Sequence, residues 1–189
     1  MPGILLVAAT ERELCGHRGL VCGVGPVEAA AATARALALD RPHCVLHVGV
    51  AGGRGLPPGS LVVGSEAAYA DLRAAIPVVD SALPDRVLLE RVTAALPDAL
   101  PLPITTSAAV SGPRDDRAGG IAVEAMEGFG VLRACALAGV PAIEVRAISN
   151  ELGEADRSRW DVAAALRALD VVLPTLLSVL TGAAGAPRR

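Results

Sequence analysis

Short apolar runs and helical segments take turns along nearly the whole chain. The apolar runs are rich in Val, Ile and Leu and are too short for most helices, which favours buried strands. The predicted strands are 4–9, 20–23, 43–50, 61–69, 104–110 and 142–148, and the predicted helices are 27–39, 85–96, 126–138 and 160–180. Strands that alternate with helices build a three-layer α/β/α domain around a mostly parallel, mixed central sheet. We expect this domain to span residues 1–181, followed by a disordered tail at 182–189.

The composition narrows the choice of partners. Of the 189 residues 52% are apolar, which is ample for a core, but only 2% are aromatic. The core must therefore be aliphatic, and a stacking surface for single-stranded nucleic acid is missing. The 17 basic residues are all Arg, and against 20 acidic residues they give a net charge of −3 with no basic stripe. We expect no binding of nucleic acid.

The length of the apolar runs indicates whether the chain could cross a membrane. The longest candidate for a membrane span, 171–180, is short and contains Pro174, and no basic segment precedes the apolar run at 4–9. A membrane span needs about 18–20 apolar residues, so the sequence predicts a cytoplasmic protein that does not enter a membrane.

The metal-binding residue types are scattered. The four cysteines, Cys15, Cys22, Cys44 and Cys135, form no CxxC motif and have no histidine at zinc-finger spacing. His43 and His47 share one face of a predicted strand, but no carboxylate cluster accompanies them. We predict free thiols, no metal and no cofactor.

Polar residues collect just after predicted strands, where sheets of this class bind ligands. They are Glu11 and Glu13, the Gly52-Gly53 turn, Glu124 and Glu127, and Ser149-Asn150-Glu151. Each alone can be read as a helix cap or a solvated charge. Together they place carboxylates and a carboxamide at one rim, which suits a reaction in which a sugar centre becomes cationic.

A rival interpretation rests on Gly23-Val24-Gly25 between a strand and an Ala-rich helix, which is similar to a dinucleotide fingerprint. The third glycine is absent, and Pro26 stands where a backbone N–H should face pyrophosphate. The acid expected at the end of the next strand is also missing, because Asp40 precedes that strand. These departures count against a nicotinamide or flavin enzyme.

The order of motifs resembles the nucleoside phosphorylase and nucleosidase superfamily. The matching segments are LVAATEREL at 6–14, GVGPVEAA at 23–30, GVAGG at 49–53, VEAMEG at 123–128 and VRAISN at 145–150. The chain is most similar to the methylthioadenosine/S-adenosylhomocysteine nucleosidase branch. The continuation NELG at 150–153, with Asp156, Arg157 and Trp160, points within that branch to the family that hydrolyses futalosine.

The resemblance implies roles for the matched residues. Glu13 would activate the attacking water. Glu127 would accept hydrogen bonds from the ribose hydroxyls, and Met126 would pack under the sugar. Ser149 and Asn150 would face the purine, with Ala51, Gly52 and Phe129 as further substrate contacts. The resemblance also implies a homo-oligomer, a dimer or higher, that needs no cofactor.

Two departures from the adenine-releasing branch bear on the substrate. The catalytic turn there is Ser-Asp, whereas this chain has Ser149-Asn150. A carboxamide delivers no proton, but it donates to a purine O6 and accepts from N7–H, which favours hypoxanthine and leaves adenine open. The stretch between Glu13 and Gly23 is also short, which could open the site to a larger 5′ substituent.

The predicted reaction is hydrolysis of futalosine to hypoxanthine and dehypoxanthine futalosine, a step of menaquinone biosynthesis. Water is favoured over phosphate because Glu11 and Glu13 would repel an anion, although Arg12 lies between them. The alternatives are an adenine-releasing nucleosidase acting on methylthioadenosine or aminodeoxyfutalosine, a purine nucleoside phosphorylase, and a nucleoside-binding regulatory module. The candidates for binding the carboxylate of futalosine are Arg54, Arg73, Arg157 and Arg159.

Overall fold

The computed structural model describes residues 3–72, 74–109 and 122–181. The strands of its sheet are β1 (Ile4–Ala8), β2 (Leu20–Val21), β3 (Cys44–Gly53), β4 (Leu61–Tyr69), β5 (Ser81–Ala82), β6 (Leu100–Thr106), β7 (Val123–Ala125) and β8 (Ala142–Glu151). The α-helices are α1 (Pro26–Leu39), α2 (Arg86–Ala95), α3 (Gly128–Ala138) and α4 (Val162–Thr181). Two 3-10 helices, η1 (Glu11–Leu14) and η2 (Arg157–Arg159), complete the described elements. The predicted tail at 182–189 lies outside the described residues.

The sheet is mixed and mainly parallel, as predicted. Strand β3 pairs in parallel with β1 and β8, and its last two residues pair antiparallel with β7. Strand β8 pairs with β4, β4 with β6, and β6 with β7. Five strands, β3, β8, β4, β6 and β7, therefore close into a ring, and β1–β2 and β5 extend from it.

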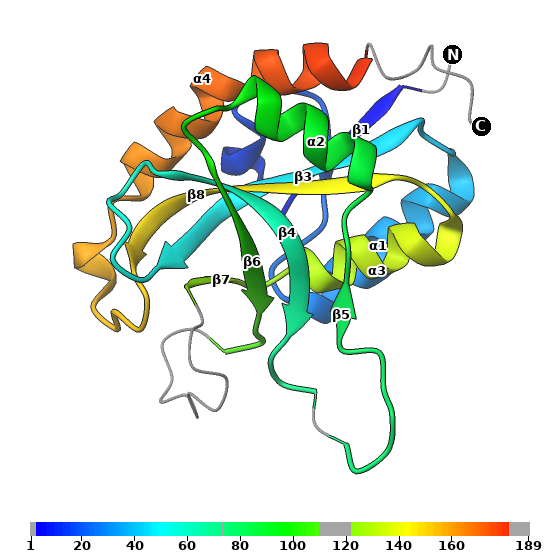
Figure 1. Ribbon diagram of the computed structural model, residues 1–189, viewed down its shortest axis with the longest axis horizontal. Helices are drawn as coiled ribbons and strands as arrows, with labels where there is room; N and C mark the ends of the chain where they lie inside the picture. The colour runs from blue at the N-terminus through cyan, green and yellow to red at the C-terminus, as the bar shows by residue number, and fades with distance from the viewer. Residues whose placement is uncertain (1–2, 73, 110–121, 182–189) are drawn as a thin grey trace.

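Helices cover both faces of the sheet (Figure 1). On one face α2 and α4 pack over an aliphatic cluster that includes Leu46, Val145 and Leu169. On the other face α1 and α3 pack over a second cluster, which includes Ala29 and Val131. The three-layer α/β/α prediction is confirmed, and burial of these aliphatic side chains is the main source of stability.

Strand β6 differs from its prediction. It begins at Leu100 and contains Pro101 and Pro103, whereas the predicted strand started at residue 104. Proline lacks an N–H and is tolerated where a strand has an open side. Residues 100–103 pair with β4, while β7 pairs with β6 from Ile104 onward, so both prolines lie where β6 has a single neighbour.

The predicted helix at 126–138 starts two residues late. Residues 123–125 form β7, Met126 and Glu127 lie in the link, and α3 begins at Gly128. A Cβ at Gly128 would lie 2.5 Å from Glu144 Oε1, so a side chain at this first helical position would displace that buried carboxylate. The prediction that Ser149-Asn150-Glu151 follows the last strand is also wrong, since these residues form the end of β8.

Helix α4 runs through Pro174, as the helix predicted at 160–180 does, and the short apolar candidate at 171–180 is part of a longer apolar helix than expected. By length and composition alone, the 20 residues of α4 could cross a membrane, with a mean hydropathy of 1.8. Its inner face, however, is fully buried against the sheet at Ala165, Leu169 and Leu173. Helix α4 therefore packs on the sheet with one face, and 22% of its apolar window is buried.

Candidate active site

A cavity of about 440 Å³ opens at the carboxyl ends of β1, β3 and β8. The link from β7 to α3 and the segment from η2 to the start of α4 complete its walls. Most of the predicted site residues line it: Glu13, Ala51, Gly52, Met126, Glu127, Ser149 and Asn150. The fold thus gathers residues from four separate segments at one rim of the sheet.

Phe129 is the exception among the predicted site residues. It is not among the residues that line the cavity. Its ring stacks on Tyr69, with ring centroids 5.1 Å apart, and its backbone N–H donates to Thr106 Oγ1 at 2.8 Å. In this structure Phe129 anchors the start of α3 to β4 and β6.

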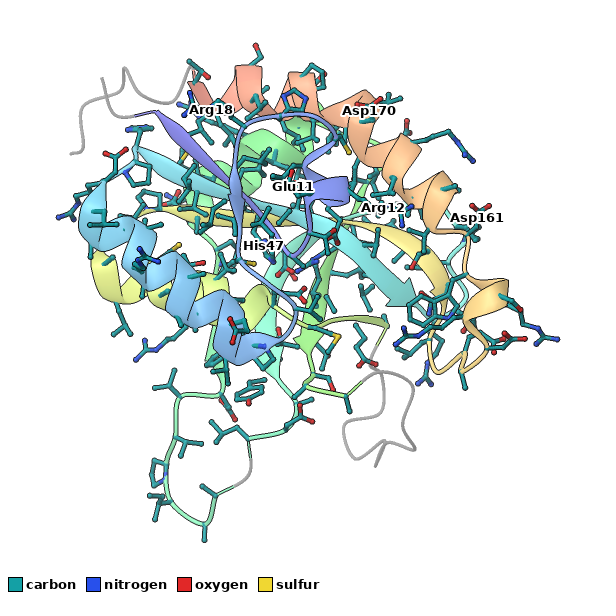
Figure 2. The ribbon with its side chains drawn as sticks, turned by 180° about the vertical axis from the view of Figure 1, so that it is seen from behind. Glu11, Arg12, Arg18, His47, Asp161 and Asp170 are labelled. Carbon is teal, nitrogen blue, oxygen red and sulfur yellow. The ribbon has the colours of Figure 1, made fainter. Side chains whose placement is uncertain are left out.

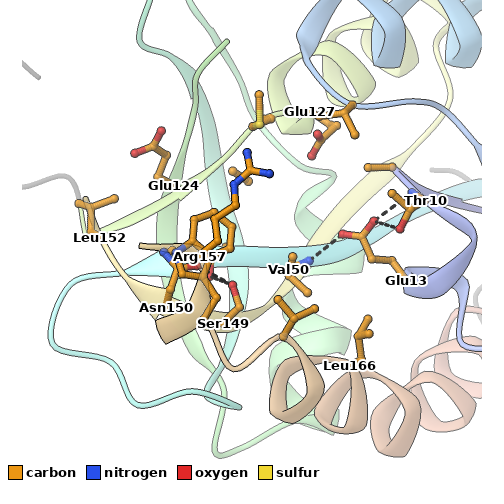
Figure 3. Close-up of a pocket in the computed structure, with 18 of the residues that line it drawn as sticks. Thr10, Glu13, Val50, Glu124, Glu127, Ser149, Asn150, Leu152, Arg157 and Leu166 are labelled. Carbon is orange, nitrogen blue, oxygen red and sulfur yellow. Dashed lines mark hydrogen bonds between the residues drawn. The ribbon is translucent and has the colours of Figure 1, made fainter. Parts of the chain in front are cut away.

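Glu13 is held by donors from two elements (Figure 3). Its Oε2 accepts from the backbone N–H and the hydroxyl of Thr10, at 2.9 and 2.7 Å, as in a capping box. Its Oε1 accepts from the N–H of Val50 in β3, at 3.0 Å. A helix cap explains the Thr10 contacts but not the Val50 contact. The carboxylate is 6% exposed and fixed in orientation at the cavity wall.

Glu127 is likewise nearly buried, at 4% exposure. Its Oε1 accepts from the N–H of Gly25 at 3.2 Å, and its Oε2 accepts from Arg146 Nη2 at 3.2 Å. Gly25 precedes α1 and Arg146 lies in β8, so three separate segments set the position of this carboxylate.

Behind Glu127 lies a fully buried network that centres on Arg146. Its Nε donates to Glu144 Oε1 at 2.7 Å, and its Nη2 also contacts Nε2 of His47. Nδ1 of His47 lies 3.1 Å from the carbonyl oxygen of Val7. A carbonyl only accepts, so Nδ1 carries the proton and Nε2 accepts from the guanidinium. Figure 2 shows His47 in the middle of the sheet.

The charges in this network are set by burial and by Arg146. Burial, reinforced by the adjacent guanidinium, holds the pKa of His47 well below its ordinary value, so the imidazole is neutral. Burial also raises the pKa of Glu144, although Arg146 opposes the rise. Burial works against the charge of Arg146, but Glu144, Glu127 and Glu13 outweigh it and raise its pKa. The arginine therefore stays cationic behind the two cavity carboxylates.

Gly49 makes room for this arrangement. A Cβ at this position in β3 would collide with Arg146 Nη1 and would lie 2.8 Å from Glu13 Oε1. Only glycine lets β3 pass this close to both side chains. The first glycine of the GVAGG motif therefore has a packing reason, next to Glu13 and Arg146.

At the other end of the cavity the amide of Asn150 has a defined orientation. Its Nδ2 donates to the carbonyl of Glu151 at 3.0 Å, and its Oδ1 accepts from the hydroxyl of Ser149 at 2.6 Å. Reversal of the amide would put its oxygen against a carbonyl oxygen. The amide keeps one N–H and one lone pair free of these contacts.

A register shift in the sheet supports this turn. Ile148 pairs with Ala51 and Asn150 with Gly52, so Ser149 is an extra residue in β8. Such bulges bend a strand and re-aim its side chains, and they are common beside active sites. Gly52 also pairs with Glu124 of β7, so the end of β3 joins the Asn150 side of the cavity to the Met126–Glu127 link.

The structure distinguishes among the four arginines that were candidates for binding a carboxylate. Arg157 lines the cavity, whereas Arg54 and Arg159 do not. Arg159 forms an ion pair with Glu154 at 3.1 Å. Arg73 lies outside the described residues.

Several residues of the site were not predicted from the sequence. Arg146 and Glu144 carried a signal, since two charges two positions apart in an apolar strand share one face and must pair when buried. Arg12 and Trp160 also line the cavity without an assigned contact, and Arg157 was one of four arginine candidates that the sequence left open. Within the described ranges, no three His, Cys, Asp or Glu side chains are grouped to hold a metal ion.

The sequence matches the Phosphorylase superfamily over residues 18–184. It is 40% identical to a futalosine hydrolase of Streptomyces coelicolor, over 95% of this chain and 84% of that protein. It is 37% identical to a futalosine hydrolase of Acidothermus cellulolyticus, over 80% of this chain and 71% of that protein.

Solved structures show the same fold at lower identity. A methylthioadenosine/S-adenosylhomocysteine nucleosidase of Colwellia psychrerythraea in complex with adenine has a TM-score of 0.82 and 21% identity, and the match covers 96% of each chain. A D198N mutant nucleosidase of Helicobacter pylori with methylthioadenosine in its active site has a TM-score of 0.84 and 17% identity, over 94% of this chain and 99% of that one.

Proposed function

Because this chain belongs to the phosphorylase superfamily and, within it, to the family of the futalosine hydrolases, we propose that it hydrolyses the N-glycosidic bond of futalosine. The products are hypoxanthine and dehypoxanthine futalosine, in a step of menaquinone biosynthesis. The observation that carries the proposal is one cavity with two oriented carboxylates at one end and an oriented carboxamide at the other.

The carboxylates suit the sugar. Cleavage of an N-glycosidic bond passes through a ribosyl centre with oxocarbenium character, which nearby negative charge stabilises. We assign to Glu127 the hydrogen bonds from the ribose hydroxyls, with Met126 beside the sugar, and both residues line the cavity. We assign to Glu13, which also lines it, the orientation and deprotonation of the water that attacks C1′.

In the proposed reaction the water oxygen forms a bond to C1′ and gives one proton to Glu13. The C1′–N9 bond breaks, and its electron pair leaves with the purine. The departing base takes a proton from solvent, and Glu13 returns its proton to solvent.

The amide of Asn150 suits a 6-oxopurine. Its remaining N–H can donate to O6, and its remaining lone pair can accept from N7–H as that bond forms. The contact to O6 strengthens as negative charge moves onto the base, and the contact from N7–H forms once N7 has taken its proton. Adenine offers an amino donor at C6 instead, which the N–H of the amide cannot meet. The amide thus favours hypoxanthine as the leaving group.

The charge of the cavity favours water over phosphate. Among the described residues, three carboxylates, Glu13, Glu124 and Glu127, line it together with two arginines, Arg12 and Arg157. A phosphate at the water position would face Glu13 and Glu127 directly, at a Coulombic cost. Glu11, which we expected to share in this effect, is not among the lining residues.

The test is release of free hypoxanthine from futalosine in phosphate-free buffer, with inosine and methylthioadenosine run in parallel. Release from futalosine alone supports the proposal. Turnover that requires added phosphate would make the chain a phosphorylase. Adenine released from methylthioadenosine would mean that Asn150 does not select a 6-oxopurine.

We also propose that the active species is a homodimer or larger oligomer in the cytoplasm. Exposed apolar side chains support self-association, since large apolar surfaces are rare on monomers. Ile76 and Leu83, in the segment around β5, are 70% and 72% exposed, and Val27 at the start of α1 is 74% exposed. In Figure 1 the segment between β4 and β5 extends away from the sheet.

A further inference from the structure

Arg157 and Trp160 form a compact pair on one wall of the cavity. The guanidinium carbon of Arg157 lies 5.8 Å from the centroid of the Trp160 ring, within range of a cation–π interaction. The indole N–H of Trp160 donates to the carbonyl of Glu154 at 3.1 Å. Asp156 caps the turn by accepting from the N–H of Ser158 at 2.9 Å. Both side chains are therefore positioned before any ligand arrives.

Arg157 has no carboxylate partner among the described residues. Arg159, two residues away in the same 3-10 turn, already pairs with Glu154 at 3.1 Å. Stacking on an indole uses the face of a guanidinium and leaves its in-plane N–H groups available. Those N–H groups form the fork that binds a carboxylate through two parallel hydrogen bonds. In Figure 3 the side chain of Arg157 points toward the cavity.

Apolar side chains line the cavity on either side of this pair along the chain. Leu152, just after β8, and Val162, at the start of α4, are lining residues, as Trp160 is. An aromatic ring packs well against such side chains and against an indole. The wall thus offers one cation beside an apolar surface, which fits a ligand with an anionic group on an aromatic ring.

Arg12 is the other arginine of the cavity, but its position is less suitable. It lies between Glu11 and Glu13, and Glu13 is the proposed base. A carboxylate bound there would approach the negative charge that the reaction needs. Arg157 follows one acidic residue in the chain, Asp156. The carboxylate of Asp156 already accepts hydrogen bonds from the N–H and the hydroxyl of Ser158.

We propose that Arg157 and Trp160 form the subsite for the aromatic carboxylate on the 5′ arm of the substrate. Arg157 binds the carboxylate, and Trp160 packs against the ring. The inference rests on the proposed function, because futalosine is the nucleoside that carries such an arm. It makes this wall the part of the site that distinguishes futalosine from inosine.

Kinetics of hypoxanthine release from futalosine test the subsite. Arg157→Gln keeps a polar stem over the indole and removes the charge, and Arg159→Gln is the matched control in the same turn. Loss of a charge-assisted pair weakens binding by about 10- to 100-fold. We expect KM to rise by that factor in Arg157→Gln, kcat to change less, and Arg159→Gln to stay within about twofold of the wild type.

A second readout needs no turnover. Trp160 is the single tryptophan of the chain, so its fluorescence reports binding at this wall. The probe is 3-acetylbenzoate, with its neutral methyl ester as the control ligand. We expect the acid to bind wild type and Arg159→Gln more tightly than Arg157→Gln, and the ester to bind all three alike.

The outcomes separate the two proposals. An unchanged KM in Arg157→Gln, or equal binding of acid and ester by the wild type, would overturn the subsite. Weaker binding of hypoxanthine itself by Arg157→Gln would assign Arg157 to the base and would also overturn it. If no futalosine is hydrolysed but 3-acetylbenzoate still binds through Arg157, the proposed function fails and the subsite stands.

Discussion

The two carboxylates at the sugar end of the cavity are held by different partners. Glu13 accepts from neutral groups, the N–H and hydroxyl of Thr10 and the N–H of Val50, so no cation neutralises it directly. Glu127 accepts from the guanidinium of Arg146 as well as from an N–H. This difference fits the proposed roles. The base, Glu13, must accept a proton, whereas Glu127 only accepts hydrogen bonds and can stay ionised.

Replacing Glu13 by Gln tests its role as the base. The amide keeps the shape but takes no proton from water, so kcat should fall by about 10²–10⁴-fold while substrate affinity changes little. Single-turnover hydrolysis and equilibrium binding measure the two effects. Glu11→Gln, an exposed change in the same 3-10 turn, is the control. A chain that only binds nucleosides would show no such separation.

The neutral histidine in the Arg146 network predicts a dependence of stability on pH. His47 has an unfolded pKa of about 6.5 and a folded pKa well below it, so the unfolded chain binds the extra proton first. Stability from this group is present above pH 6.5 and is lost as the pH falls below it, by up to about 1.4 kcal/mol per pH unit. Glu144, whose pKa burial raises, contributes in the opposite sense.

Urea unfolding between pH 7.5 and 5 measures this slope. The variant His47→Gln keeps a group that can accept from Arg146 and donate to Val7, but it does not titrate. We expect a smaller loss of stability on acidification in the variant than in the wild type. Identical slopes would show that His47 does not carry the effect.

At the scale of elements, the start of α3 depends on its first residue. Gly128 lies over the carboxylate of Glu144, and a side chain there would force the helix and β8 apart. Overpacking of this kind costs about 1–3 kcal/mol. Gly128→Ala should lower the free energy of unfolding by that amount in urea titrations, whereas Gly3→Ala, with open space around it, should have no effect. Equal stability of the two variants would contradict the packing argument.

The elements that the sequence predicted well are those with a strong local pattern. The buried strands β1, β3, β4 and β8 and the helices α1 and α2 have uniform apolar runs or good helix formers. Strands β5 and β7, two and three residues long, have no pattern of their own and exist because β4 and β6 supply partners. Strand β6 was misplaced because its prolines are acceptable only where a neighbouring strand is missing, which is a property of the sheet.

The same distinction applies to the cavity. Residues placed directly after or at the end of a strand, such as Glu13 and Asn150, could be chosen from sequence because the sheet fixes where strand ends lie. Phe129 was named as a substrate contact on the resemblance alone, and its ring stacks on Tyr69 instead of lining the cavity. Arg157 and Trp160 reach the cavity through a turn whose path depends on α4 packing on the sheet, and no local signal records that path.

For the whole molecule, the exposed apolar side chains around β5 and the start of α1 predict self-association. Ile76→Glu combined with Leu83→Glu would place two charges in a buried interface, at a cost that dissociates a dimer. Light scattering after size exclusion should show a larger species for the wild type and a monomer for the double variant. Leu39→Glu, at the other end of α1 and 78% exposed, should leave the assembly intact. A monomeric wild type would end the proposal.

The closed ring of five strands separates site residues that the sheet holds in place from site residues that lie outside it, where substitutions disturb the sheet less. Asn150 and the terminal glycines of β3 belong to the ring, whose ladder fixes one strand against the next, and Glu13 and Glu127 are tied to its strands β3 and β8. Arg157 and Trp160 belong to a short turn outside it, held by its own cap. On the proposed assignment, substitutions in that turn can therefore change which 5′ substituent is bound, while Glu13, Glu127 and Asn150 keep their positions. A lineage built on this ring can acquire new nucleoside substrates by remodelling a few residues between β8 and α4.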